Sequence, residues 1–186
     1  VPYRLARHAG RLAAPEVFHE RKTDARIDRV LEELLSQEAP IAQSWVVRRA
    51  AERFGIERVT ERVEERVIER LMALPHERVW QGDDVEILWA SGQDPTAYGV
   101  FRVPTDDEAT RRAVEDIPWV EVANAAYHVL KGHVSMPETD LARETGRLLG
   151  QQRLGSTVQR VMAAGIDALV RSGRAVRTPD AVVLAD

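Results

Sequence analysis

The sequence repeats itself, and this repetition constrains the fold more than any other feature. Shifting residues 24–74 by 95 positions keeps the spacing of the apolar residues without a gap. In each copy they begin at i, i+3, i+4, i+7 and i+8, which is typical of one buried face of a helix. The pairs are Ile27/Val122, Val30/Ala125, Leu31/Ala126, Leu34/Val129 and Leu35/Leu130. We therefore predict two copies of one small helical unit.

Two more helices are expected in each copy. Gly55 and Gly150 end the second helix, and Thr60 or Ser156 caps the start of the third. Ser135 is the expected cap of the second helix in the second copy. The buried pairs are Val46/Leu141, Ala50/Thr145 and Phe54/Leu149 in the second helix, and Val63/Val158, Val67/Met162, Leu71/Ile166 and Leu74/Leu169 in the third.

Each copy ends in an alternating stretch with a turn in its middle, which predicts a β-hairpin. These stretches are residues 78–89, turning at Gly82-Asp83, and residues 175–185, turning near Pro179-Asp180. Short extended runs at 39–42 and 133–136 supply a small first strand. Three helices and a hairpin follow the order of a winged helix-turn-helix domain; the alternative is a three-helix bundle with a trailing hairpin. We predict a mainly α chain with small β-hairpins (α+β), built from tandem winged helix-turn-helix domains.

Four segments follow from the repeat. Residues 1–22 form a basic tail from an upstream region, 23–90 the first winged-helix copy, 91–118 a linker and 119–186 the second copy. Within the linker, residues 97–104 are expected to form a strand, followed by a short acidic turn or helix. Because the chain begins with valine rather than methionine, we expect it to be a piece of a longer protein.

Composition excludes several classes of function. The chain has no cysteine, which removes disulfides, thiol catalysis and cysteine zinc sites and fits a reducing cytosol. No run approaches the roughly 18 to 20 apolar residues that cross a bilayer, and no signal peptide is recognisable. A net charge of -4 gives no global attraction for nucleic acid or anionic membranes. We therefore expect a cytoplasmic protein without a membrane partner.

Residues 114–130, "VEDIPWVEVANAAYHVL", and 141–176, "LARETGRLLGQQRLGSTVQRVMAAGIDALVRSGRAV", resemble a known family. It is the uncharacterised C-terminal domain of large bacterial proteins that join a superfamily 1 helicase to a Vsr-like nuclease of the restriction-endonuclease fold. The resemblance covers the second copy well, through Gly150, Arg153 and Gly155-Ser156, and the first copy more loosely. It implies an upstream ATP-dependent helicase or nuclease, and in some members a role in anti-phage defence.

No residue pattern indicates catalysis. The acidic run "DDVE" at 83–86 lies on a predicted hairpin turn, and no lysine follows at the distance of a nuclease motif. His128 and His133 are five positions apart, so they do not share one face of a helix. We expect a chain that is not itself an enzyme and has no metal site and no cofactor.

Local charge distinguishes the two copies. Residues 24–89 carry ten basic and fifteen acidic residues, a net of -5, whereas residues 119–186 carry eight and seven, a net of +1. In the third helix of the first copy, Arg62, Arg66 and Arg70 alternate with glutamates, which predicts ion pairs within a solvated helix. That copy is therefore expected to be structural or protein-binding, with Arg62 and Arg66 among the contact residues.

The third helix of the second copy begins with amides and arginines and has no acid before Asp167. Arginine and glutamine suit base edges, and a helix N-terminus attracts phosphate. The alternative is an ordinary polar surface. The predicted nucleic-acid-binding residues are Gln151, Gln152, Arg153, Ser156, Thr157, Gln159 and Arg160, with Arg174 and Arg177 in the wing.

The sequence thus predicts a non-catalytic nucleic-acid-binding accessory of a larger helicase or nuclease, with weak DNA binding through the second copy. The alternative is a protein-interaction or dimerisation module that docks on the parent enzyme. Trp80 is the expected contact residue of that alternative. If Val79 and Ile87 face the core, Trp80 lies on the outer side of the hairpin, where either another chain or Tyr98 or Phe101 of the linker covers it.

Overall fold

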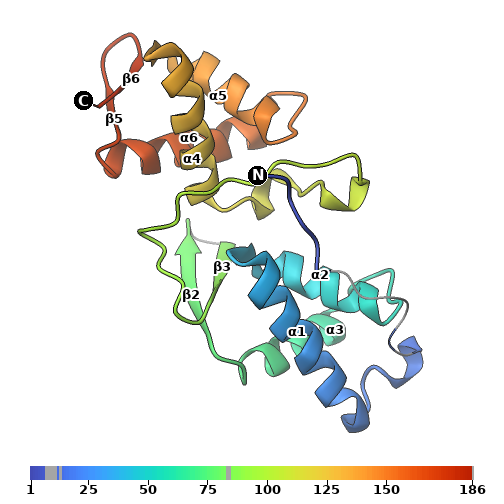
Figure 1. Ribbon diagram of the computed structural model, residues 1–186. Coiled ribbons are helices and arrows are strands. Elements are labelled where there is room, and N and C mark those ends of the chain that lie inside the picture. Colours follow the sequence, from blue (N-terminus) through green and yellow to red (C-terminus); the bar gives the residue numbers. More distant parts are fainter. Residues whose placement is uncertain (7–11, 13, 83–84, 186) are drawn as a thin grey trace. The chain divides into compact units, whose positions relative to one another are not determined.

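The computed structural model describes residues 1–6, 12, 14–82 and 85–185. These residues contain six α-helices and two three-stranded antiparallel sheets, so the chain is α+β. They form two compact units, and each is described by itself (Figure 1). The first unit is Arg4–Gln93, and the second combines Val1–Tyr3 with Asp94–Asp186.

The first unit consists of three helices and one sheet, preceded by two short 3-10 helices. The strand order in the sheet is β1-β3-β2. In chain order the elements are η1 (Pro15–Val17), η2 (Arg21–Thr23), α1 (Asp24–Glu38), β1 (Ile41–Ala42), α2 (Gln43–Arg53), α3 (Glu61–Leu71), β2 (His76–Gln81) and β3 (Val85–Ala90).

The core of the first unit contains the predicted helix faces. Buried positions of α1, α2 and α3 recur every three or four residues, which brings them onto one side of each helix. The N-terminal residues also contribute, because Ala6 and Phe18 are buried in the same core. The buried carboxylate of Glu38 accepts a hydrogen bond from the Ala6 amide at 2.8 Å. Ala6 and Phe18 of the predicted tail are therefore packed parts of the first unit.

The second unit has the same order of elements. Its strand order is β4-β6-β5, which corresponds to β1-β3-β2 in the first unit. The elements are η3 (Glu108–Thr110), η4 (Val114–Asp116), α4 (Trp119–His133), β4 (Ser135–Met136), α5 (Glu138–Leu148), α6 (Ser156–Arg171), β5 (Ala175–Arg177) and β6 (Val182–Leu184). Both predicted hairpins and both short first strands are confirmed.

The helix ends agree with the sequence in part. The Thr60 hydroxyl accepts a hydrogen bond from the Val63 amide, so its prediction as a cap is confirmed. Gly55 and Gly150 have φ values of 68° and 86°, the left-handed conformation that often follows a helix. The other two caps are wrong. Ser156 is the first residue of α6 rather than its cap, and Ser135 lies in β4, since proline precedes α5 directly.

The linker is mostly irregular. Residues 97–104 form no regular strand; Val103 makes a single parallel bridge with Pro2. The Tyr3 amide donates to the Val103 carbonyl at 2.8 Å, and the Val103 amide donates to the Val1 carbonyl at 2.9 Å. The acidic part of the linker forms the two short 3-10 helices. In the described chain, no helix has the length and apolar content that a membrane span requires.

Candidate nucleic-acid interface

The turn between α5 and α6 places most of the predicted nucleic-acid-binding residues at one end of α6. The positive φ of Gly150 reverses the chain, and the Gln151 amide donates to the Gly146 carbonyl at 2.8 Å. Gln151 and Thr157 are half-buried. The exposed members are Gln152, Arg153, Ser156, Gln159 and Arg160. The sequence prediction thus corresponds to a contiguous polar surface on the first turns of α6.

This surface keeps its positive charge. Arg153 and Arg160 make no ion pair with any residue that the structure describes. The first acid of α6, Asp167, is used elsewhere, because it accepts from Arg177 at 2.7 Å. Two exposed arginines therefore lie within a few residues of the N-terminus of α6, and both positive charge and a helix N-terminus favour anions.

The two wing arginines, in contrast, have intramolecular partners. Arg177 donates to both oxygens of Glu138 at 2.8 and 2.9 Å, as well as to Asp167. The hydrogen bonds that the Arg177 guanidinium donates to these two carboxylates raise its pKa. Arg174 donates to Asn124 at 2.8 Å and to Ser172 at 3.0 Å. Binding of DNA through the wing stays a prediction. It requires Arg174 and Arg177 to exchange these intramolecular contacts for contacts with phosphate.

The third helix of the first unit uses its arginines differently from what local spacing predicts. Arg66 pairs with Asp24 of α1, and Arg70 donates to Asp28 of α1 at 2.8 Å. Only a looser contact of 3.6 Å joins Arg66 to Glu69 of its own helix. The expected ion pair within the helix is therefore present for Arg66, but the shorter contacts of Arg66 and Arg70 are with α1 and hold α3 against it. Arg62 is exposed.

His19 lies in the field of the same arginines. Its partial burial lowers the pKa of the imidazole, and the positive charges of Arg62 and Arg66 lower it further. A neutral imidazole avoids repulsion from these guanidinium groups. His19 therefore adds no positive charge to this side of the first unit at neutral pH.

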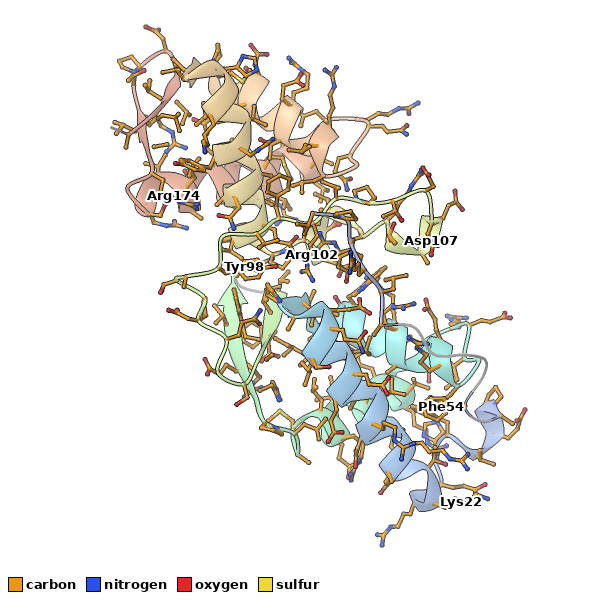
Figure 2. All side chains as sticks on the ribbon, in the orientation of Figure 1. Lys22, Phe54, Tyr98, Arg102, Asp107 and Arg174 are labelled. Carbon is orange, nitrogen blue, oxygen red and sulfur yellow. The ribbon has the colours of Figure 1, made fainter. Side chains whose placement is uncertain are left out.

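A buried ionic cluster in the second unit has no counterpart among the predicted site residues. The carboxylate of Glu121 on α4 is fully buried and accepts from Arg112 at 2.7 and 3.0 Å and from the Arg102 amide at 2.8 Å. The Arg102 guanidinium pairs with the same carboxylate. Both guanidinium groups lie over the ring of Tyr3, at 4.5 and 4.9 Å from its centre. Figure 2 shows Arg102 on the linker beside α4.

This cluster attaches the linker and the first residues of the chain to α4. Its groups bind one another and are buried, which favours a structural role over ligand binding. One signal in the sequence points to it: Glu121 is the only acid in the mainly apolar helix "WVEVANAAYHVLKGH". The arginines that pair with it cannot be identified from spacing.

Two surface hollows border the linker within the second unit. The larger, of about 620 Å³, lies between residues 95–99 and helices α4 and α6, with Arg174 on its rim. Asn124 holds this part of the linker by donating to the carbonyls of Tyr98 and Val100, both at 2.9 Å. The smaller, of about 330 Å³, is lined by Pro104, Thr105, Asp106, Arg111, Arg147, Gly150, Gln151 and Gln152. The smaller hollow therefore adjoins the α6 surface.

The residues considered for catalysis are not gathered into a site. Asp83 and Asp84 lie outside the described residues, and Glu86 is buried and paired with Arg78 at 3.1 Å. The ring of His128 packs near that of Phe101, with centroids 5.4 Å apart. Within the described parts of the chain, no group of three or more histidines and acids is arranged to hold a metal ion.

Trp80 is exposed, but not for the predicted reason. Leu88 rather than Ile87 faces the core of the first unit, and Trp80 shares the strand face of Leu88. Ile87 and Trp89 are buried on the other face. Trp80 is 60% exposed. Within the second unit, Phe101 packs on the core and the Tyr98 carbonyl accepts a hydrogen bond from Asn124. Cover of Trp80 by these linker aromatics stays a prediction.

Comparison with known proteins gives one match. A family described as a protein of unknown function (DUF3320) matches residues 16–65. This match runs from η1 into α3 and therefore lies in the first unit, whereas the resemblance in the sequence is strongest in the second. No curated protein and no solved structure matches the chain.

Proposed function

We propose that each unit is a winged helix-turn-helix domain and that the chain is a tandem of two. The support is topological. Each unit has the order helix, strand, helix, helix, strand, strand, and in each sheet the last strand lies between the other two. In this arrangement the third helix is the recognition helix and the hairpin is the wing.

The proposed function is nucleic-acid binding by the second unit, as a non-catalytic accessory of a larger protein. One observation carries it: the exposed arginines at the start of α6 have no acidic partner among the described residues, whereas Arg66 and Arg70 of α3 are paired with α1. Phosphate neutralisation supplies most of the affinity of such contacts, so the unpaired guanidinium groups favour the second unit.

DNA binding should depend on the arginines of α6. We expect weak binding of duplex DNA, about micromolar at best, that falls steeply as salt is raised. Replacing Arg153 and Arg160 with alanine removes two phosphate contacts, so the slope of log K against log salt should decrease by roughly 2. Fluorescence anisotropy of a labelled duplex, titrated at several salt concentrations, measures both quantities.

The control is the double alanine variant of Glu61 and Arg62, which lie at the start of α3; this variant leaves the net charge unchanged. It should bind as the unchanged chain does. Equal losses from both double variants, or binding that is insensitive to salt, would contradict the assignment to the second unit.

We further propose that the parent protein is a helicase joined to a nuclease, with a cytoplasmic location. This part rests on the resemblance of residues 114–130 and 141–176, and the absence of cysteine fits it. Reading the complete open reading frame tests it, because a helicase must then be encoded upstream.

A second candidate function is protein interaction through the first unit. An exposed tryptophan often marks a contact surface, and Trp80 is 60% exposed. Acrylamide quenching of Trp80 fluorescence can be measured as the difference between the unchanged chain and a Trp80→Phe variant. If two copies of the chain pair through this surface, the quenching should decrease as the protein concentration rises. The same quenching at all concentrations would exclude such pairing.

A further inference from the structure

The linker forms one wall of the smaller hollow and is held closely against the α5–α6 turn. A side chain at Gly150, whose φ is 86°, would place its Cβ 2.6 Å from Cγ of Pro104, so glycine permits this close approach. Gln151 and Gln152 of the turn before α6 line the hollow, and Arg153 is the next residue in the chain. It is therefore part of the surface for which nucleic-acid binding is proposed.

Hydrogen bonds fix the linker where it reaches the hollow. The Thr105 amide donates to the Thr110 hydroxyl at 2.9 Å, and that hydroxyl donates to the Asp107 carbonyl at 2.6 Å. The Asp107 carboxylate accepts from the Ala109 amide at 3.1 Å and so caps η3 (Figure 2). Arg111 follows this closed turn directly. Its position on the rim is consequently set by an ordered backbone.

The charges around the hollow favour an anion. Arg111 is exposed and makes no side-chain ion pair with the residues that the structure describes. Arg147 is 61% exposed and contacts Glu144 at 2.7 Å, a surface pair of the kind that contributes little to stability and exchanges readily. Asp106 also lines the hollow and opposes an anion. Two guanidinium groups against one carboxylate leave the lining with a net positive charge.

We propose that the linker completes the nucleic-acid interface: Arg111 and Arg147 bind a backbone phosphate of the same duplex that contacts Arg153, and Asp106 limits the affinity. This inference rests on the proposed function of the second unit. It assigns to the linker a binding role in addition to its structural one. Guanidinium groups are suited to phosphate because their planar N–H groups match its oxygens.

The test uses the whole chain and a labelled mixed-sequence duplex at several salt concentrations, of which the lowest is about 50 mM. Arg111→Ala and Arg147→Ala should each weaken binding about 3- to 10-fold and lower the salt slope by about 1. Asp106→Asn should strengthen binding about 2- to 5-fold, because a repulsive charge is removed. Arg143→Ala is the matched control for Arg147→Ala. Arg143 also lies on α5 and also pairs with the acid three residues before it, Asp140, but it does not line the hollow.

The outcomes separate the two proposals. Losses at Arg111 and Arg147 that exceed the loss at Arg143, with a gain at Asp106, support the linker contact. If Arg153→Ala weakens binding while Arg111→Ala and Arg147→Ala do no more than Arg143→Ala, the linker contact is wrong and the α6 interface stands. If the unchanged chain binds no duplex at low salt, both proposals fall. Circular dichroism of each variant confirms that the exposed substitutions leave the fold intact.

Discussion

Replacing Glu121 with glutamine should destabilise the second unit by about 3 to 5 kcal/mol, the usual cost of removing one partner from a buried ionic group. The glutamine keeps the size of the side chain but removes its charge. The guanidinium groups of Arg102 and Arg112, which are 9% and 5% exposed, then lose the carboxylate that pairs with both of them.

Hydrogen exchange in the intact chain measures this effect in each unit separately. Amides of α4 and α6 should lose protection, while those of α1 and α3 should not change. Glu115→Gln is the control, because Glu115 is exposed and close in sequence, and surface changes of this kind usually stay within about 0.5 kcal/mol. Unchanged protection of α4 in the Glu121 variant would show that the cluster contributes nothing net to stability.

The same carboxylate gives the second unit an acid sensitivity. Burial alone would raise the pKa of Glu121, but the charges and hydrogen bonds of Arg112 and Arg102 outweigh it and hold the pKa at about 2, against 4.5 for the free side chain. A lowered pKa stabilises the folded state fully above pH 4.5 and progressively less as the pH falls towards 2. The difference in stability between the unchanged chain and Glu121→Gln should therefore shrink over this pH range.

The regular parts of the fold follow from periodic patterns. Ile27, Leu31 and Leu34 are spaced for a helix, and all are buried in α1. The prediction succeeds because the buried face of an amphipathic helix is visible as a three- to four-residue spacing of apolar residues in the sequence. The hairpins are also local, since their strands are neighbours and their turns carry recognisable residues. The order of helices and strands in both units could therefore be predicted from the sequence.

The N-terminal residues and the linker were harder to predict because long-range contacts hold them. Tyr3 lies against Arg102 and Arg112, and the Ala6 amide bonds to Glu38. These contacts involve single residues far apart in sequence and have no period. The strand expected at residues 97–104 is replaced by a single bridge for the same reason. The bridge joins Val103 to Pro2, which is far from it in the sequence.

In the candidate site, exposure was predictable but pairing was not. The start of α6 is exposed as its polar sequence indicates. Arg66 and Arg70, however, have glutamates on their own helix and still pair with Asp24 and Asp28, because packing of α3 on α1 brings these aspartates beside them. Only the tertiary fold determines which carboxylate an arginine meets.

The orientation of the hairpin in the first unit was ambiguous for a different reason. Ile87, Leu88 and Trp89 are consecutive and all buried, so β3 is covered on both faces. A strand of this kind lacks the apolar–polar alternation that identifies the core side. Trp80 was therefore assigned to the wrong face, and its cover by the linker or by another chain stays a prediction.

The second large effect is expected at Gly165, where α6 passes α4. A Cβ at this position would lie 2.2 Å from Cγ1 and 2.3 Å from Cβ of Val122, which is fully buried. The Cβ of valine is fixed to the backbone, so the helices must separate to admit even one methyl group. Gly165→Ala should consequently destabilise the second unit by about 1 to 3 kcal/mol, despite the better helix propensity of alanine.

Gly132→Ala is the matched control and should have the opposite sign. Gly132 lies on α4 with nothing within 4 Å of its added Cβ, so alanine there should stabilise the unit by up to about 1 kcal/mol. Hydrogen exchange of α4 and α6 gives both changes. A Val122→Ala substitution removes the two Cγ atoms of Val122 but leaves its Cβ, so it should recover part of the stability lost in Gly165→Ala. The double variant should therefore be more stable than the sum of the two single changes predicts. Strict additivity would show that the two residues are not in contact and that the helices are farther apart than described.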